Sequence, residues 1–362
     1  MEIALSLPLE RCHVHVGTSF GSITPTLSEK RSMFILGMGF FGQSLARKLH
    51  NQGWVVSGTC TTHVKKKELQ EMGFNVHLFD ANHPDVDVLQ VMKNYSHILV
   101  SVPPLVGIGD PMLRHEELLR SSLTDGDLRL SKTRFAPLQA MSTAALTYFS
   151  NAFRFKYDDR DTFCLAGVYG DCDGELVDED YPTNPESGLA KLRLASEEGW
   201  SNLAHNLGIS PLLFRLGGIY GPGRSAVDTI IKQKPMSEGQ KRRKNRKYTS
   251  RIHVDDICQA LMATVLAPPP REVYNIVDDD PAPREEVFEY AMKLVEKKWP
   301  GLKLQSVEQK QKEWPNAKNP RGEKRVCNAR MKRELGVQLL YPDYKSGLKS
   351  IIHQIQTPFQ SH

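Results

Sequence analysis

The amino-acid sequence predicts an α/β fold, in which a doubly wound parallel sheet is joined to a smaller C-terminal lobe. Apolar, strand-like runs alternate with helical patterns along the chain, as they do in parallel βαβ units. The first of these runs, residues 33–36, leads straight into Gly37, Gly39 and Gly42, and a helical pattern follows. With 362 residues the chain can hold one doubly wound domain and a smaller lobe. Glycines at this spacing between a strand and a helix are typical of a Rossmann-type sheet.

The strands and two well-marked helices can be placed in order. Leu45 and Leu49 lie four residues apart in a helix predicted over residues 41–51, which Gly53 ends. A later helix is predicted to begin with Asn184 as its cap and Pro185 at its first position, and to run towards residue 208. The strands are expected at residues 33–36, 54–58, 75–79, 97–102, 163–167, 211–216 and 273–277.

One segment does not match this alternation. Residues 131–161 carry no clear helical or strand pattern, although they directly precede an expected core strand. A structureless stretch of this length is uncommon inside a compact domain. The segment is either an added surface loop or an abnormal piece, such as the result of mis-splicing. Around it we expect a dinucleotide-binding domain formed by residues 33–217 and 251–279, and a small substrate lobe formed by residues 218–250 and 280–350.

Composition and charge argue against several classes of protein. The net charge of +5 is concentrated in residues 241–247, which hold six of the 47 lysines and arginines, and the other 41 are balanced by 42 acidic residues. A solvated surface loop explains such a run better than a nuclear signal, and no nucleic-acid partner is expected. The six cysteines are scattered without the spacing of a zinc site, so no metal is expected. No stretch is as long as a membrane span.

The first 32 residues differ from the rest of the chain. They include eight serines and threonines and show no clear periodicity, which is typical of an organellar transit peptide. Glu2, Glu10 and Glu29 weaken this interpretation, because transit peptides contain few acidic residues. The segment is therefore either a targeting sequence for the chloroplast or another organelle, or a disordered tail of a cytoplasmic protein.

The glycine turn can build an anion site from backbone atoms alone. Gly37 allows the tight turn, Gly39 lets the main chain approach a pyrophosphate, and Gly42 lets the helix pack closely on the strand. The helix start at Phe40 and Phe41 offers unpaired N–H groups and the positive end of the helix dipole. We expect these five residues to bind a dinucleotide. The alternative is an ordinary tight turn.

The residues after the second strand bear on which dinucleotide binds. After the second strand, an NAD site usually presents a carboxylate to the ribose 2′-hydroxyl. Here the first acidic residue after the strand is Glu68. Thr59, Thr61 and Lys65 instead supply hydroxyls and a cation, which suit a 2′-phosphate. NADP is therefore preferred over NAD. The alternative is that Lys65 and the two lysines after it only begin a solvated helix.

Residues after the third and fourth strands complete the expected cofactor site. Asp80 is placed to accept a hydrogen bond from the adenine N6 amino group. Ser101, Val102 and Pro103 are expected to border the middle of the cofactor, because ligands of such sheets bind at the carboxyl ends of the strands. Pro103 and Pro104 limit the shapes that this loop can adopt.

Six separated stretches, taken together, carry a family resemblance. They are the glycine turn and residues 167–171 (GVYGD), 215–224 (RLGGIYGPGR), 251–257 (RIHVDDI), 274–279 (YNIVDD) and 328–336 (NARMKRELG). In this order they resemble the extended short-chain dehydrogenase/reductase superfamily, of the NAD-dependent epimerase/dehydratase type. The resemblance implies a nicotinamide dinucleotide and a small-molecule substrate, such as a sugar nucleotide or a carbonyl compound. A homodimer is compatible with it.

The catalytic pair of that family is only half present. The family's reaction uses a tyrosine and a lysine one helical turn apart, where the lysine helps to ionise the phenol for proton exchange. Lys191 matches the lysine, but Ser187 stands at the tyrosine position, and an aliphatic hydroxyl is far less acidic than a phenol. The family's helper Ser or Thr is also missing, since Cys164, Leu165 and Ala166 occupy that stretch. Lys191 is either a ribose ligand or a solvated helix lysine.

Other polar residues of the resembling stretches have weaker claims to a role. Tyr169 and Tyr220 lie in turns where an aromatic ring usually packs, and Tyr181 lacks the one-turn spacing from the lysine. The resemblance places Arg224 and Arg251 near the substrate cleft, where they could clamp a phosphate or a carboxylate. The alternative is that both arginines pair inside the protein with Asp255 or Asp256.

Two functions are consistent with these residues. The first is an oxidoreductase or isomerase that uses NADP or NAD, with Lys191, Ser187 and an unidentified proton donor at its catalytic site. The second is a catalytically inactive dinucleotide-binding scaffold or redox sensor. The missing tyrosine favours the second, and the retained lysine and lobe segments favour the first.

Overall fold

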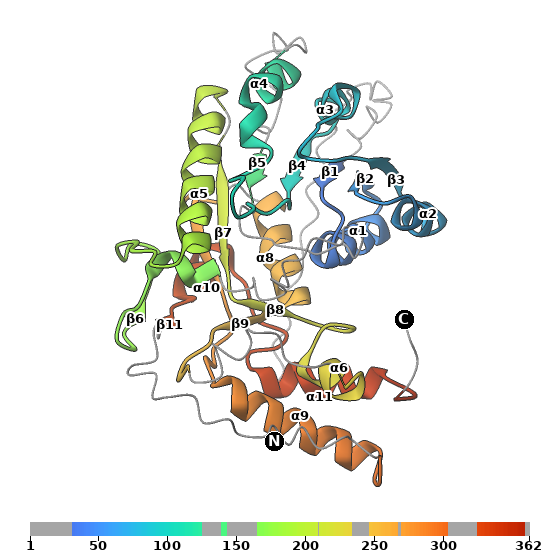
Figure 1. Cartoon of the computed structure of the whole chain (residues 1–362), viewed down its shortest axis with the longest axis vertical. Helices are drawn as coiled ribbons and strands as arrows, with labels where there is room; N and C mark the ends of the chain where they lie inside the picture. Colours follow the sequence, from blue (N-terminus) through green and yellow to red (C-terminus); the bar gives the residue numbers. More distant parts are fainter. Residues whose placement is uncertain are drawn as a thin grey trace, which may run out of the picture. The chain divides into compact units, whose positions relative to one another are not determined.

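A computed structural model describes residues 31–124, 139–142, 165–208, 210–233, 246–266, 269–302 and 324–358. Within these ranges seven parallel strands form one sheet: β1 (Ser32–Leu36), β2 (Val55–Cys60), β3 (Asn75–Leu78), β4 (His97–Val100), β5 (Gln139–Ser142), β7 (Leu212–Leu216) and β10 (Val273–Ile276). Their order in space is β10–β7–β5–β4–β1–β2–β3 (Figure 1). The order reverses at β1, so the prediction of a doubly wound parallel sheet of Rossmann type is confirmed.

Helices cover both faces of this sheet. The face that carries Met33 and Ile35 of β1 packs against helices α1 (Phe40–Asn51), α2 (His63–Glu71), α8 (Val254–Leu266) and α10 (Ala329–Leu335). The opposite face, with Phe34 and Leu36, packs against α3 (Val86–Met92), α4 (Glu116–Thr124) and α5 (Gly188–Asn206). These four β1 side chains are fully buried, as expected for the central strand of a two-faced sheet.

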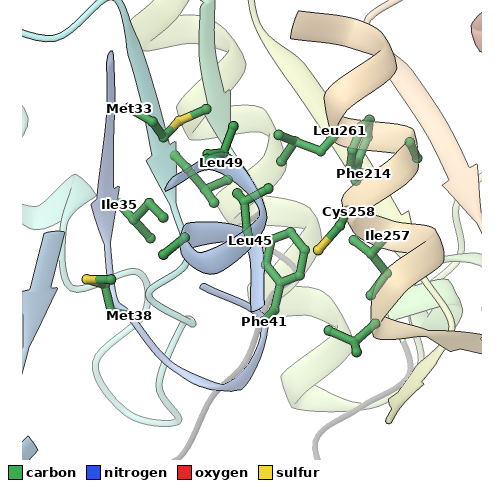
Figure 2. Close-up of a cluster of buried hydrophobic side chains, with 14 of the residues drawn as sticks. Met33, Ile35, Met38, Phe41, Leu45, Leu49, Phe214, Ile257, Cys258 and Leu261 are labelled. Carbon is green, nitrogen blue, oxygen red and sulfur yellow. The ribbon is translucent and has the colours of Figure 1, made fainter. Parts of the chain in front are cut away.

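The contact between α1 and α8 forms much of the larger core. Figure 2 shows Leu45 and Leu49 of α1 on the side of the helix that also carries Phe41, with Ile257 and Leu261 of α8 nearby. Leu45 and Leu49 share one face, as their spacing predicts. This packing holds α1 against β1 and so sets the position of the turn that joins them.

Outside the large sheet lie two short pairs of strands and a group of three helices with a core of its own. Strands β8 (Gly218–Tyr220) and β9 (Arg251–His253) pair in parallel, and β6 (Leu176–Val177) pairs with β11 (Arg325–Val326). Helices α6 (Ala226–Ile231), α9 (Arg284–Lys298) and α11 (Tyr344–Gln354) bury apolar side chains among themselves. These helices come from the segments expected to form the small lobe, whereas the exact domain boundaries stay a prediction.

Two sequence expectations about local structure are wrong. A strand is expected at residues 163–167. In the described part of this range, from residue 165 onward, the chain instead forms a short 3₁₀ helix, Leu165–Tyr169. The strand between β4 and β7 is instead β5, which lies inside the segment 131–161 and which no sequence pattern predicts. Short apolar runs do not separate strand from helical turn, so only the pairing with β4 and β7 identifies the strand.

Helix α5 also starts later than expected. Its N-cap is Ser187, not Asn184, and Gly188 is its first residue. The backbone N–H of Asn184 donates to the carbonyl oxygen of Val168 at 2.9 Å, which ties this residue to the preceding 3₁₀ helix. Pro185 therefore belongs to the connection and does not begin the helix.

Within the described ranges, no helix combines the length and apolar character that a bilayer span requires. In the same ranges, His, Cys, Asp and Glu side chains do not gather in threes as metal ligands. The expectations for residues 1–30, for residues 241–245 of the basic run and for Cys164 concern parts of the chain outside the described residues.

Candidate functional site

The turn between β1 and α1 requires glycine at its first position. Gly37 has a φ of 93°, which L-residues rarely adopt. A Cβ atom on Gly37 would lie 3.1 Å from the carbonyl oxygen of Ser101. At the third glycine, Gly42, a Cβ atom would lie 2.8 Å from the carbonyl oxygen of Gly37. The helix therefore approaches the strand as closely as the glycine spacing predicts.

Thr59 of β2 supports this turn from inside the protein. Its side-chain oxygen accepts a hydrogen bond from the N–H of Gly37 at 2.9 Å, and its carbonyl oxygen accepts one from the N–H of Met38 at 2.7 Å. Thr59 is only 2% exposed. Thr59 therefore holds the glycine turn in place from inside the protein, and its contact with a cofactor stays a prediction.

The start of α1 is open to an anion. The N-cap, Gly39, has no side chain to satisfy the first N–H groups, and the first turn holds no acidic residue. The first helical hydrogen bond runs from the N–H of Gln43 to the carbonyl oxygen of Gly39 at 2.9 Å. No described residue accepts a hydrogen bond from the N–H groups of Phe40, Phe41 or Gly42. Such donors at the positive end of a helix dipole form an anion site.

The loop after β4 lies directly against the glycine turn. The N–H of Ser101 donates to the carbonyl oxygen of Leu36 at 2.8 Å, and a Cβ atom on Gly37 would lie 3.5 Å from Cγ2 of Val102. β1 and β4 are neighbours at the point where the strand order reverses, which is where ligands of such sheets bind. Ser101 is buried, whereas Val102 and Pro103 are half-buried and border this position.

The end of β2 presents hydroxyls and cations, as the sequence suggests. Thr61 is exposed, and Thr62 caps α2 by accepting a hydrogen bond from the N–H of Lys65 at 3.2 Å. The Lys65 ammonium pairs with the carboxylate of Glu68 at 2.8 Å. That carboxylate is therefore engaged by a lysine of its own helix, and the first position after β2 carries no acid.

Asp80, expected near the adenine, is exposed and has local partners. Its Oδ1 accepts hydrogen bonds from the backbone N–H of Asn82 at 2.9 Å and from the side-chain amide at 3.0 Å. Partial burial opposes ionisation, but these hydrogen bonds and the neighbouring His83 together lower the pKa of the Asp80 carboxyl. Asp80 is thus an ionised acceptor whose second oxygen faces His83 at 3.5 Å.

The expected catalytic pair lies at the start of α5. Ser187 caps the helix, and its hydroxyl oxygen accepts a hydrogen bond from the N–H of Ala190 at 3.2 Å. Lys191 is exposed, and in the described part of the chain its ammonium forms no ion pair or side-chain hydrogen bond. The pair therefore consists of a capping hydroxyl and a solvated ammonium one turn further along.

The tyrosines named as substitute proton donors have structural roles. Tyr169 is 1% exposed, donates to Oδ1 of Asn275 at 2.8 Å and accepts from Nη1 of Arg215 at 3.0 Å. Burial raises the pKa of Tyr169, although Arg215 opposes the shift. Tyr220 is also buried, which raises its pKa, and Tyr181 donates to the carboxylate of Glu175 at 3.3 Å.

Sequence reasoning did not identify the roles of two buried residues, Glu197 and Asn275, which contact Arg215 and Tyr169. Glu197 pairs with Arg215 at 2.9 Å, and both side chains are buried. Asn275 accepts from the hydroxyl of Tyr169. These contacts join α5 and β10 to the 3₁₀ helix, over separations that no local pattern reveals.

The two candidate substrate arginines differ in position. Arg251 is 9% exposed, and its Nη1 donates to the carbonyl oxygens of Thr249 and Ala282, both at 2.7 Å. These contacts tie Arg251 to the backbone on both sides, and its role as a substrate ligand stays a prediction. Arg224 is half-buried, and its guanidinium carbon lies 5.3 Å from the ring centroid of Phe40, the first residue of α1.

The carboxylates expected to pair with these arginines have other partners. Asp255 pairs with Lys48 of α1 at 2.8 Å. Asp256 accepts hydrogen bonds from the backbone N–H groups of Leu340 at 2.6 Å and Tyr341 at 3.2 Å. The described contacts of Asp255 and Asp256 are therefore with a lysine and with backbone N–H groups.

Similar proteins share the fold along most of the chain. No protein-family model matches. Protein YeeZ of Escherichia coli (strain K12) is 26% identical over 321 residues, which cover 86% of this chain and 97% of YeeZ. A functionally unknown conserved protein from Silicibacter pomeroyi DSS is 28% identical, with a TM-score of 0.64 over 91% of this chain and 100% of its own. UDP-glucuronic acid 4-epimerase from Bacillus cereus, in complex with NAD, is 16% identical, with a TM-score of 0.58 over 90% and 97%.

Proposed function

Because the chain has the fold of the extended short-chain dehydrogenases/reductases of the NAD-dependent epimerase/dehydratase type, we propose that it binds a nicotinamide dinucleotide at the glycine turn. The observation that carries this proposal is the open start of α1, where the N–H groups of Phe40, Phe41 and Gly42 have no described partner. This start lies beside the loop of Ser101 and Val102, at the reversal of strand order.

The proposed cofactor is NADP, with NAD as the alternative. Thr61 is exposed after β2 and Lys65 follows within one turn of α2. The nearest acid, Glu68, pairs with Lys65, so no free carboxylate of this segment opposes a 2′-phosphate. Asp80 at the end of β3 is the proposed adenine contact.

The proposed activity is that of an oxidoreductase or isomerase on a sugar nucleotide or a small carbonyl compound. The Bacillus cereus relative of the same fold is named for such a substrate and holds NAD. Lys191 is the residue proposed to reach the nicotinamide ribose, since its ammonium is exposed one turn inside α5.

Mass spectrometry of ligand released from the purified protein, followed by titration with NADPH, tests the cofactor. Gly39 has a φ of −77°, outside the left-handed region that favours glycine, and a valine side chain there would occupy the approach of the pyrophosphate. We expect Gly39→Val to weaken NADPH binding at least about a hundredfold, roughly 3 kcal/mol, with little change in stability. Gly188→Ala at the first position of α5 is the control, because its Cβ atom would meet nothing within 4 Å. Equal NADPH fluorescence titrations for Gly39→Val and the native chain would refute the site.

A second candidate function is a dinucleotide-binding scaffold or redox sensor without turnover. It is favoured by one observation, the use of the Ser187 hydroxyl as a helix cap. Ser187→Tyr restores a phenol one turn before Lys191, and Ser187→Phe is the matched control without the hydroxyl. NADPH oxidation by the Tyr variant alone, across a panel of carbonyl substrates, supports a degenerate enzyme site. Equal inactivity of the native chain and both variants supports the scaffold.

A further inference from the structure

We propose that Arg224 binds the pyrophosphate of the dinucleotide, and so contacts the cofactor from the small-lobe side. This inference rests on the proposed function and assigns Arg224 to the cofactor instead of the substrate. It starts from the position of Arg224 beside Phe40, the residue that follows the glycine turn.

The backbone fixes where Arg224 lies. The N–H of Gly221 donates to the carbonyl oxygen of Arg224 at 3.1 Å, and the N–H of Arg224 donates back to Gly221 at 3.0 Å. Gly223, between them, has a φ of 82°. This turn, closed by two backbone hydrogen bonds, follows β8 directly. The backbone of Arg224 is therefore held in a fixed position.

The turn lies directly on the start of α1. A Cβ atom on Gly221 would be 3.2 Å from Cζ of Phe40, so only glycine allows the ring to pack here without adjustment. The Arg224 guanidinium carbon lies 5.3 Å from the centroid of the same ring, within the range of a cation–π contact. Phe40 is the first residue of α1, so this contact joins Arg224 to the first turn of the helix.

The charges of this arrangement complement a pyrophosphate. Backbone N–H groups and a helix dipole supply partial positive charge on one side, and a planar guanidinium supplies a full charge and paired donors on the other. No acidic residue occurs in the first turn of α1. Arg251, the other arginine of these stretches, is buried and donates to two backbone carbonyl oxygens.

Three ligands separate the pyrophosphate from the rest of the cofactor. ADP-ribose carries the pyrophosphate without the nicotinamide, 2′-AMP carries a phosphate without the pyrophosphate, and NADPH carries both. By calorimetry, we expect Arg224→Gln to weaken ADP-ribose and NADPH binding about tenfold to a hundredfold and to change 2′-AMP binding less than about twofold. Arg224→Lys keeps the positive charge but lacks the paired N–H donors of a guanidinium, so we expect a smaller loss of affinity for ADP-ribose and NADPH. Arg47→Gln, an exposed arginine further along α1, controls for net charge.

These affinities distinguish the role of Arg224 from the existence of the cofactor site. Native-like affinity of Arg224→Gln for ADP-ribose, or equal losses for ADP-ribose and 2′-AMP, would overturn the role of Arg224 while leaving the cofactor site intact. Failure of the native chain to bind either NADPH or ADP-ribose would instead overturn the proposed function. If Arg224→Gln does not fold, as judged by circular dichroism, Arg224→Lys decides: undiminished ADP-ribose affinity in that variant counts against the bidentate contact.

Discussion

The starts of α1 and α5 are two helix N-termini of one doubly wound domain, and they differ in how the N-cap residue bonds the first N–H groups. The α1 start is capped by Gly39, which has no side chain, and its first N–H groups have no described partner. The α5 start is capped by Ser187, whose hydroxyl accepts from the N–H of Ala190. A ligand can therefore bind the open N–H groups of the first start, whereas one N–H group of the second, that of Ala190, is already bonded by its own chain.

This difference explains how a cofactor site can persist beside an incomplete catalytic pair. The proposed pyrophosphate site includes backbone N–H groups of the α1 start, which most substitutions outside the glycines leave in place. Proton transfer depends on one phenol at one position, and a serine there forms a cap instead. A third start, that of α8, has carboxylates in its first turn, Asp255 and Asp256.

The largest effect is expected inside α5, not at its start. Glu197 pairs with Arg215 in a fully enclosed position, and removal of one partner leaves a buried charge. We expect Glu197→Ala to lower the free energy of unfolding by about 3–5 kcal/mol in urea denaturation. Glu198→Ala, one residue later and exposed, is the control. A loss below about 1 kcal/mol for Glu197→Ala would show that the network does not anchor α5.

The junction of β9 and α8 should show two opposing pH effects. Burial lowers the pKa of His253 from 6.5 to about 4, so the stability from keeping it neutral is present above pH 6.5 and is lost as the pH falls towards 4. Burial raises the pKa of Asp256 from 3.8 to about 6, so the stability from keeping it protonated is present below pH 3.8 and is lost as the pH rises through 6. Each contribution is about 3 kcal/mol, and between pH 4 and 6 they largely cancel.

Two variants separate these contributions when each is compared with the native chain, because other buried groups such as Asp278 have shifted pKa values in all three proteins. Asp256→Asn leaves His253 to titrate, so its unfolding free energy should rise between pH 4 and 6.5. His253→Gln leaves Asp256 to titrate, so its unfolding free energy should fall between pH 4 and 6. Urea denaturation at four pH values across this window measures both slopes. Slopes of the same sign in the two variants would contradict the assignment.

The glycine turn should be sensitive to a single methyl group. A Cβ atom on Gly42 would lie 2.8 Å from the carbonyl oxygen of Gly37, and backbone cannot move aside as a flexible side chain can. We expect Gly42→Ala to cost about 1–3 kcal/mol of stability and to weaken NADPH binding, because the helix start shifts away from β1. Gly188→Ala has space for its methyl group and should be nearly neutral. Equal stability of the two variants would argue against close packing at Gly42.

The smallest effect is expected at the α5 cap. Ser187→Ala removes the hydroxyl that accepts from Ala190 and should lower the unfolding free energy by about 1 kcal/mol. NADPH affinity should stay within about twofold of the native value, since the cap is not part of the proposed cofactor site. Ser187→Asp, which can cap the helix, should recover the stability. A large loss of NADPH affinity in the alanine variant would place Ser187 in the cofactor site and remove the contrast between the two helix starts.

Local patterns were enough to find the glycine turn and most of the sheet. The strands at β1, β2, β3, β4, β7 and β10 and the helix α1 lie within one or two residues of their expected positions. The position of β5 was missed because its only evidence is its pairing with β4 and β7. The cap of α5 was misplaced because Asn184 bonds to Val168, a contact that its neighbours in sequence do not indicate.

The sequence alone determined that a tight, side-chain-free turn follows the first strand, because φ values near +90° and close helix packing are available only to glycine. It also determined that no carboxylate directly follows β2. Only the tertiary structure decided that Thr59 supports the turn, that Arg251 serves buried carbonyls and that Arg224 lies on Phe40. The roles of these three polar side chains depend on what lies opposite them, and those partners are brought there by packing between segments far apart in the chain.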